Sequence, residues 1–428
     1  MNLAALLLAA ALVLDGEAAN RDIAAHPPAV QPFLRYASTQ RIAAEDQAAA
    51  ARALALVVAS ASPQPIIERA TPQPIGPTLY RLNLLDLQIR PQDWDFIVRD
   101  YPYSAVVPAR VVRADWLALE LSDCQENPDA YYRIVYGGRI PKTRDEALKL
   151  LGVSADPGER VGIIAGESGV SKTRVRYIEK RPMTGRGGWA WGTRDVLKLD
   201  NNADPLEHPA GDFKHDGEEW IIGRLKYSSA RRVTGALQVY FLANGQGQIV
   251  QRAPVDLVED FGEFRGLREI RNAGSCIGCH DNGLNLPSKD EFLGLLDSGV
   301  RRIEQYGEAR DRLEAFFYSD LGKDFRRANE DYAAAVNLVC GCTGEEAAAA
   351  FKAAVDRYDA PLDLERAALE SYVTAETLAQ TIALASASGG KLPARIIGLT
   401  AGGTCPRSAW EADWLAVRNE LYRWGKLK

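Results

Sequence analysis

The feature that most constrains this chain is a run of five residues, Cys276-Ile277-Gly278-Cys279-His280. In a C-x-x-C-H run, the two thiols are spaced to add across the two vinyl groups of a porphyrin and form two thioether bonds. The imidazole that follows is then held beneath the iron and becomes its proximal ligand. The run therefore predicts one covalent c-type haem, attached through Cys276 and Cys279 and ligated by His280.

The same spacing has two other chemical interpretations. A C-x-x-C pair followed by His can form half of a zinc site, or it can be a thioredoxin-like redox pair. The chain contains only six cysteines and four histidines, so this ordered triple is rarely produced by chance. Haem attachment is therefore the favoured interpretation.

Length and composition limit the class of protein. A chain of 428 residues is longer than a small cytochrome core requires, so we expect two or three domains. Hydrophobic residues make up 46% and charged residues 25%, which is typical of a globular protein. Because the net charge is -6 and basic residues are spread along the chain, we expect no nucleic-acid partner.

The N-terminus resembles a secretory signal. Residues 3–14 form an apolar block, which is too short to span a bilayer and fits the hydrophobic part of a signal peptide. We therefore interpret residues 1–19 as a signal peptide with cleavage after Ala18, although no Lys or Arg precedes the block. Export to the periplasm, or otherwise out of the cytoplasm, agrees with covalent haem attachment. No later stretch is long and apolar enough to span a membrane.

Four cysteines remain beside the haem motif, namely Cys124, Cys340, Cys342 and Cys405. An even number in an exported protein permits disulfides. Cys340 and Cys342 are too close in sequence to bridge comfortably to each other, so a link from either one to Cys405 is favoured. Buried thiols are the open alternative, and a zinc site that includes Cys340 and Cys342 is less favoured.

Hydrophobic periodicity predicts an α+β fold in three parts. Residues 20–125 form an N-terminal α+β domain with a helix at 38–61, a proline-rich linker at 62–78, a short helix from Pro91, and strands at 79–84 and 111–121. Residues 126–272 form a mixed region with a helix at 143–152 and a looped glycine-rich middle. Strands follow at 219–225 and 236–242, and a turn at Asn244-Gly245 before a strand at 248–252 indicates an antiparallel hairpin. Residues 273–428 form a helical cytochrome c-like region. Its expected helices are 289–296, 300–318, 324–339, 345–358, 362–371, 375–387 and a last one with Trp410 and Trp414.

The sixth iron ligand decides the chemistry, because a second protein ligand favours electron transfer and an open position favours binding or activating a small molecule. Met1 would leave with a signal peptide, and His26 lies in a terminal segment. The open candidates are therefore His208, His215 and Met183. Asp216 or Glu218 could orient a ligating imidazole.

Several segments resemble a family of large exported bacterial proteins that carry a single c-type haem and have no established function. The matching segments are FKHDGEEWI from Phe213, LQVYFLANGQG from Leu237, Ala253-Pro254 and the run Ser275–His280, with similar stretches at 79–86, 100–103 and 112–116. The resemblance covers about residues 35–295. In place of the family's usual Leu-Pro-Asn-Gly turn, this chain has the longer basic segment 226–234. The resemblance implies that His215, ahead of the two glutamates, is the second axial ligand.

These observations predict an exported electron-transfer cytochrome with a redox partner that the sequence does not identify. One alternative is a haem enzyme or sensor, for example peroxidase-like, with an open site where His208, Arg181 or Arg186 assists. Another is a partner-binding subunit of a larger redox complex. Beyond the haem we find no catalytic constellation, and Glu218 with Glu219 is interpreted as the start of a strand.

Overall fold

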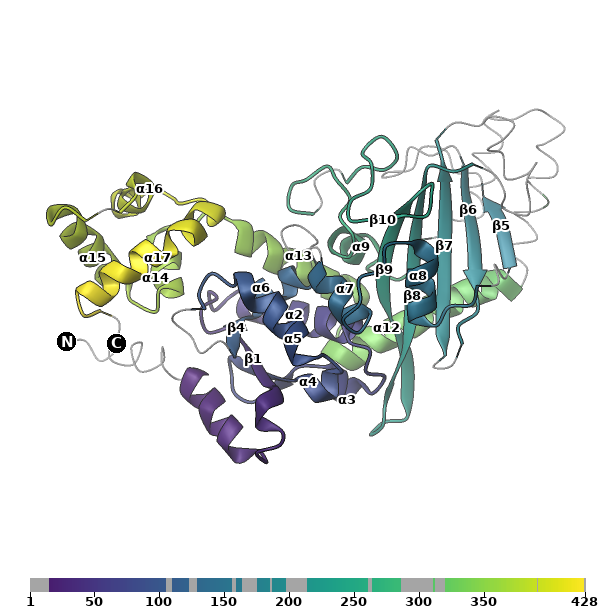
Figure 1. Ribbon diagram of the computed structural model, residues 1–428, viewed down its shortest axis with the longest axis horizontal. Helices are drawn as coiled ribbons and strands as arrows, with labels where there is room; N and C mark the ends of the chain where they lie inside the picture. Colours follow the sequence, from purple (N-terminus) through teal and green to yellow (C-terminus); the bar gives the residue numbers. More distant parts are fainter. Residues whose placement is uncertain are drawn as a thin grey trace.

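An α+β architecture is present, as predicted, and its parts are arranged along one long axis (Figure 1). The computed structural model describes residues 15–104, 110–122, 129–155, 159–163, 175–184, 187–197, 214–260, 264–285, 311, 320–390 and 392–426. A six-stranded sheet lies at one end, the last helices lie at the other, and the N-terminal part lies between them.

The N-terminal part contains a four-stranded sheet in the order β2-β3-β1-β4. Its strands are β1 (Leu34–Ser38), β2 (Gln73–Pro74), β3 (Leu79–Asn83) and β4 (Val111–Arg113). Strand β1 is antiparallel to β3 and parallel to β4. The helices α2 (Gln47–Ala61) and α6 (Ala114–Glu120) pack against each other beside this sheet.

Two sequence predictions in this part were wrong. The helix expected at 38–61 begins only at Gln47, because Ser38 pairs with Leu79 in the sheet. The strand expected at 111–121 ends at Arg113 and continues as helix α6. Every residue from Ala114 to Leu119 is buried, so the apolar run carries no alternation that would separate helix from strand.

The larger sheet has the order β10-β9-β8-β7-β6-β5, with each neighbouring pair antiparallel. Its strands are β5 (Glu159–Ile163), β6 (Val175–Arg181), β7 (Gly188–Val196), β8 (Gly217–Ser228), β9 (Val233–Asn244) and β10 (Ile249–Val250). The expected antiparallel strands are confirmed: β8 pairs with β9, and the chain turns after Asn244 so that β10 pairs with β9. Most of the segment 226–234 continues β8 and β9, and only residues 229–232 form the turn.

Strands β5 to β7 were not predicted, and β7 was missed because the glycines at its start were interpreted as loop residues. Gly192 instead lies within β7, where a Cβ atom would come within 2.6 Å of the Trp220 ring. The glycine therefore makes room for a buried tryptophan of the neighbouring strand. Neither hydrophobic periodicity nor strand propensity reveals such a packing role.

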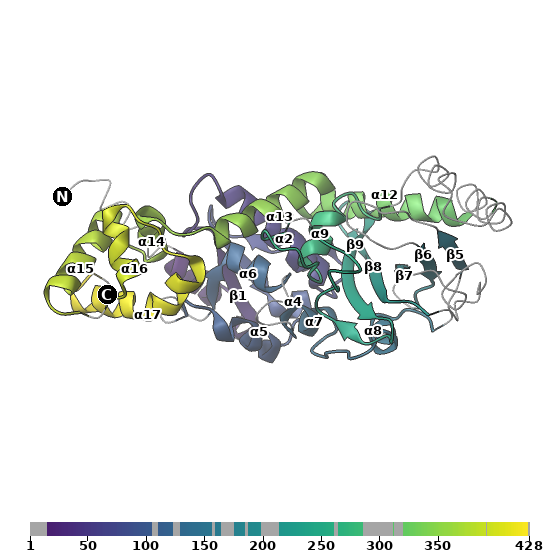
Figure 2. The ribbon, with the colours of Figure 1, turned by 90° about the horizontal axis from the view of Figure 1, so that it is seen from above.

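Helices cover both faces of the larger sheet. Helix α8 (Arg144–Leu151) lies on one side, and α12 (Asp320–Cys340) lies on the other (Figure 2). The short helix α9 (Gly274–Cys279) lies on the α12 side, and α13 (Gly344–Asp359) continues from α12 to pack on α2. Two of the predicted helices begin at side-chain N-caps: Thr143 accepts a hydrogen bond from the Glu146 N–H, and Thr374 accepts one from the Thr377 N–H.

The C-terminal region is helical, as predicted. Its elements are α14 (Leu364–Glu370), α15 (Ala375–Ala387), α16 (Ala394–Ile397), η3 (Gly398–Ala401) and α17 (Arg407–Arg423). The expected helices at 289–296 and 300–318 lie outside the described residues. The shorter elements elsewhere are η1 (Gln31–Phe33), α3 (Ile67–Ala70), α4 (Leu84–Leu87), α5 (Pro91–Ile97), η2 (Val98–Asp100) and α7 (Asp129–Val135).

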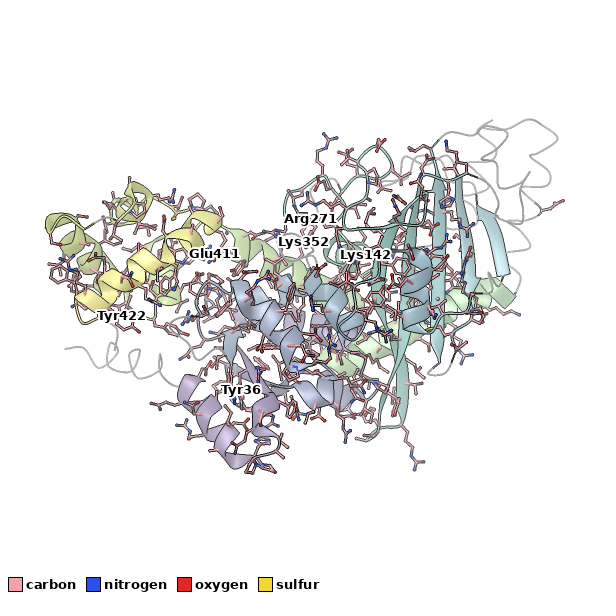
Figure 3. The ribbon with its side chains drawn as sticks, in the orientation of Figure 1. Tyr36, Lys142, Arg271, Lys352, Glu411 and Tyr422 are labelled. Atoms are coloured by element: carbon pink, nitrogen blue, oxygen red, sulfur yellow. A yellow bond between two sulfur atoms is a disulfide. The ribbon has the colours of Figure 1, made fainter. Side chains whose placement is uncertain are left out.

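Residues 15–25 form a helix that packs on the smaller sheet, and it includes the cleavage point expected after Ala18. Asp15 accepts hydrogen bonds from Ser38 and Thr78, and Asp22 accepts one from the Tyr36 hydroxyl at 2.8 Å (Figure 3). The first 14 residues of the expected signal peptide lie outside the described part of the chain. Among the described helices, none has the length and apolar character needed to cross a bilayer.

The disulfide arrangement differs from the prediction. Cys340 is joined to Cys342, and Cys405 is a buried thiol. Gly341 between the two cysteines has a φ of +64°, a left-handed conformation that closes the chain back on itself after α12. The resulting distance of 5.3 Å between the two Cα atoms lies within the normal range for a disulfide. Cys124 lies outside the described residues.

Candidate haem site

Helix α9 presents the two cysteines of the C-x-x-C-H run from one turn. Cys276 and Cys279 are three residues apart, so their side chains lie on the same side of the helix. Both are thiols, Cys276 buried and Cys279 half-buried. Thioether formation requires two thiols on one side of the chain, and this helix supplies them.

A tight turn sets the direction of α9. Ala273 has φ 65° and ψ -58°, and the Gly274 N–H donates to the Asn272 carbonyl at 2.9 Å, which closes a three-residue γ-turn. This conformation is rare and strained for a residue with a Cβ atom. Gly274 packs directly against the Phe264 ring. A Cβ atom at this position would lie only 2.4 Å from the ring.

His280 follows α9 immediately, and its ring is held by its neighbours. Its backbone N–H donates to the Cys276 carbonyl at 2.8 Å, and its Nδ1 is 2.9 Å from the Gly283 carbonyl oxygen. A carbonyl can only accept, so Nδ1 carries the proton. Metal-binding imidazoles are commonly oriented by such a bond, with the other nitrogen left to bind the metal.

The other nitrogen of His280, Nε2, faces a carboxylate on the central strand β8. Glu219 Oε1 is 3.2 Å from it. Burial alone would raise the pKa of Glu219, but the interaction with His280, together with nearby Arg176, lowers that pKa to about 2. Glu219 is therefore an ionised, nearly buried partner at the position from which an iron ion would approach.

The surroundings of His280 fix it in place. The Tyr240 ring of β9 stacks on the imidazole at 6.1 Å between ring centres. Asn329 of α12 accepts from the Leu284 N–H at 2.7 Å and donates to the Leu284 carbonyl at 3.0 Å. Gly344, at the start of α13, lies so close to the Asp281 carbonyl that a Cβ would come within 1.8 Å. Helices α12 and α13 thus clamp the loop that follows His280.

His215 lies on the opposite face of the sheet from His280. Its Nε2 is 2.7 Å from Glu218 Oε1, and Arg144 of α8 also contacts this carboxylate at 2.7 Å. Successive side chains of a strand point to opposite faces, so Glu218 and Glu219 hold their two histidines on opposite sides of β8. To ligate the same iron as His280, His215 would have to leave Glu218 and cross the sheet.

Met183 is also distant from His280. Its sulfur lies beside Gly188, which pairs with Arg224, five residues along β8 from Glu219. At about 3.4 Å per residue, this places Met183 roughly 17 Å along the strand from the His280 contact. His208, the third candidate, lies outside the described residues.

The residues considered for an open site are also not brought to His280. Arg181 lies over the Trp220 ring and is paired with Glu179, on the face of His215. Arg186 lies outside the part of the chain that the structure describes. His26 lies beside Asp22 and Arg81 near the smaller sheet.

Glu219, Tyr240 and Gly283 were missed as site residues by the sequence analysis. The pair Glu218-Glu219 was interpreted as the start of a strand, which it is, since β8 begins at Gly217. The alternation of side chains along a strand could have indicated that the two carboxylates point to opposite faces of the sheet. Nothing in the sequence marks the contacts of Tyr240 and Gly283, because they depend on how β9 and the loop after α9 pack.

The two thiols and the oriented imidazole match what a covalent haem requires. Within the described residues, no group of three or more His, Cys, Asp and Glu side chains is arranged to hold a metal ion.

Comparisons with known proteins find no match for this chain. No protein-family model matches it, no curated protein is similar to it, and no solved structure shares its fold detectably.

Proposed function

We propose that the chain is an exported c-type cytochrome that transfers electrons through one haem bound to Cys276 and Cys279. The observation that carries the proposal is the geometry of the run itself. Two thiols share one side of α9, and His280 donates Nδ1–H to Gly283, leaving Nε2 for a metal. The haem would supply a one-electron iron couple, and the protein holds and orients it.

Each residue of the site has a distinct part in this proposal. The thiols anchor the porphyrin, and the Gly283 carbonyl fixes the tautomer and orientation of the His280 imidazole. The lone pair of Nε2 can bind either iron or a proton shared with Glu219, but not both. Haem binding would therefore replace the contact between His280 and Glu219. The released carboxylate would then stand near the haem and influence its potential.

The direct test is the mass of the denatured chain. Protein made in a host with cytochrome c maturation should retain one haem after denaturation, and replacing both cysteines by alanine should abolish this. Cys405→Ala is the matched control, because Cys405 is a buried thiol outside the motif. A denatured chain without any haem mass would overturn the proposal.

The placement of His215 and Met183 favours a second candidate function. Neither residue is near His280, so among the described residues no expected sixth ligand closes the iron. An open position would allow a small molecule to bind, as in a haem enzyme or sensor. Carbon monoxide should then bind the reduced protein rapidly, whereas a closed six-coordinate iron would resist it.

A further inference from the structure

A buried arginine far from the haem motif lacks hydrogen bonds. Arg41, in the loop between β1 and α2, is 3% exposed, and within the described chain none of its three guanidinium nitrogens has a hydrogen-bond partner. Its charge lies over the faces of the Tyr103 and Tyr372 rings. Stacking on the rings leaves the five N–H donors of the guanidinium without acceptors. In buried arginines these donors normally form hydrogen bonds.

The groups around Arg41 leave an excess of positive charge. Four buried or half-buried arginines face three carboxylates here. The arginines are Arg41, Arg113, Arg366 and Arg407, and the carboxylates are those of Asp115, Glu370 and Asp363. Arg113 binds Asp115 and Glu370, and Arg407 binds Glu370 through two nitrogens. Arg366 donates to backbone carbonyls instead. Among these described groups, one positive charge therefore remains without a carboxylate, and Arg41 is the arginine that forms no ion pair or hydrogen bond.

The positive charge affects the ionisation of the arginines themselves. Burial and, to a smaller extent, nearby Arg113 lower the pKa of Arg41 to about 9, although Tyr101, Tyr103 and Glu370 act in the opposite direction. Burial also lowers the pKa of Arg366, with Arg407 and Arg113 adding to the effect. Buried charges are normally paired, because leaving one unpaired costs several kcal/mol, so this cluster calls for an anion.

A small cavity adjoins the unpaired guanidinium. It has a volume of about 20 Å³ and is lined by Arg41, Arg113, Arg366, Asp115 and Glu370, with the ion pair of Arg357 and Asp46 at its edge. A cavity of roughly 10–15 Å³ by this measure holds one water molecule, so this one accepts a single small particle and excludes phosphate or sulfate. We propose that the cavity beside Arg41 binds one chloride ion.

The proposed ion would join two parts of the molecule. Of the arginines that line the cavity, Arg41 and Arg113 belong to the N-terminal part, whereas Arg366 lies on α14. A chloride ion between them would offset their repulsion and stabilise the docking of the C-terminal helices. A water molecule could accept hydrogen bonds from Arg41 but would leave the excess charge in place.

Chloride binding can be tested by thermal unfolding of the full protein with sodium chloride or sodium gluconate at equal ionic strength. Gluconate is too large for the cavity. We expect the chloride sample to melt about 2–4 °C higher, as binding to the folded state alone requires. Arg41→Met should lose this difference. Arg35→Met should keep it, because Arg35 is a buried arginine that donates to the Pro32 and Leu34 carbonyls instead.

Equal melting temperatures in the two salts, or a chloride effect that survives Arg41→Met, would overturn the proposal. If Arg41→Met does not fold, crystals of the unchanged protein grown in sodium bromide decide the question. An anomalous bromide peak beside Arg41 would support the site, and a cavity without one would exclude it.

Discussion

At the residue scale, adjacent glutamates of one strand have separate roles. Glu218 binds His215, Arg144 and the Trp220 indole, all on the α8 face of the sheet. Glu219 faces the opposite side and meets His280. Because successive side chains of a strand point to opposite faces of the sheet, the two adjacent glutamates lie in two separate environments. The sheet itself therefore separates the histidine in the C-x-x-C-H run from the one expected to share its iron.

This separation predicts the effect of removing His215. In the haem-loaded protein, His215→Ala should leave the ferric absorption spectrum and spin state unchanged, because the imidazole binds Glu218 rather than iron. Stability should fall by about 1–3 kcal/mol, the cost of leaving a buried carboxylate with fewer partners. His208→Ala is the comparison, since His208 remains a candidate ligand. A change from low to high spin in His215→Ala would show that His215 does reach the iron.

The γ-turn at Ala273 predicts a stabilising substitution. A non-glycine residue in a strained conformation costs about 1–3 kcal/mol, and glycine removes most of that strain at a smaller entropic cost. Ala273→Gly should therefore raise the free energy of unfolding by about 1 kcal/mol, measured by urea titration. Ala130→Gly, at a buried helical position in α7, should lower it instead. Destabilisation by Ala273→Gly would mean that the turn is not strained.

At the scale of elements, some of the fold could be predicted from the sequence and some could not. The helices around Thr143, Thr343 and Thr374 carry their own capping residues, so local chemistry fixes where they begin. Strands β8, β9 and β10 were recognisable from alternation and from the turn after Asn244. Strand β7 was not, because glycines indicated a loop there, whereas Gly192 of β7 accommodates Trp220 of another strand.

The candidate site divides in the same way. Cys276, Cys279 and His280 could be identified because covalent haem attachment requires residues close together in sequence. The partners of His280 come from β8 and β9, and α12 holds Leu284 in the loop that follows, so only the packed structure reveals these contacts. The disulfide between Cys340 and Cys342 was wrongly excluded because the left-handed turn at Gly341 was not anticipated.

The cap of α13 provides a prediction at this scale. Thr343 and Glu346 form a reciprocal capping box, in which each side chain bonds the other's backbone N–H. Thr343→Ala should cost about 1 kcal/mol of stability in chemical denaturation. Thr343→Ser keeps the hydroxyl and should stay near the unchanged protein. If both variants lose the same amount, the methyl group of Thr343 matters rather than the cap.

At the scale of the whole molecule, one carboxylate joins the C-terminal helices to the N-terminal part. Glu370 of α14 forms an ion pair with Arg113, and it accepts hydrogen bonds from both terminal nitrogens of Arg407 and from the Tyr103 hydroxyl. Trp410 of α17 donates to the same hydroxyl at 3.1 Å. Nearby, Tyr358 of α13 donates to Glu411 of α17 (Figure 3). The docking of the last helices therefore depends on a buried ionic network rather than on apolar contacts alone.

Glu370→Gln should weaken this docking strongly. The substitution keeps the shape of the side chain but leaves Arg113 and Arg407 without their shared carboxylate. Removing one partner from a buried ion pair costs about 3–5 kcal/mol. Limited proteolysis should release the C-terminal helices faster than in the unchanged protein. Glu365→Gln, an exposed position on the same helix, is the control and should change the free energy by less than about 0.5 kcal/mol.

The same carboxylate predicts how stability depends on pH. Burial alone would raise the pKa of Glu370, but Arg113 and Arg407 hold it well below its ordinary value of 4.5. The unfolded chain therefore takes up this proton at a higher pH than the folded protein does. The stabilisation is fully present above pH 4.5 and is lost as the pH falls below that value. Between about pH 4 and pH 3, Glu370→Gln should show a slope of unfolding free energy against pH that is shallower by up to about 1.4 kcal/mol per unit. An identical slope in both proteins would mean that Glu370 is not ionised in the folded state, and the network would then have to hold the C-terminal helices by hydrogen bonds alone.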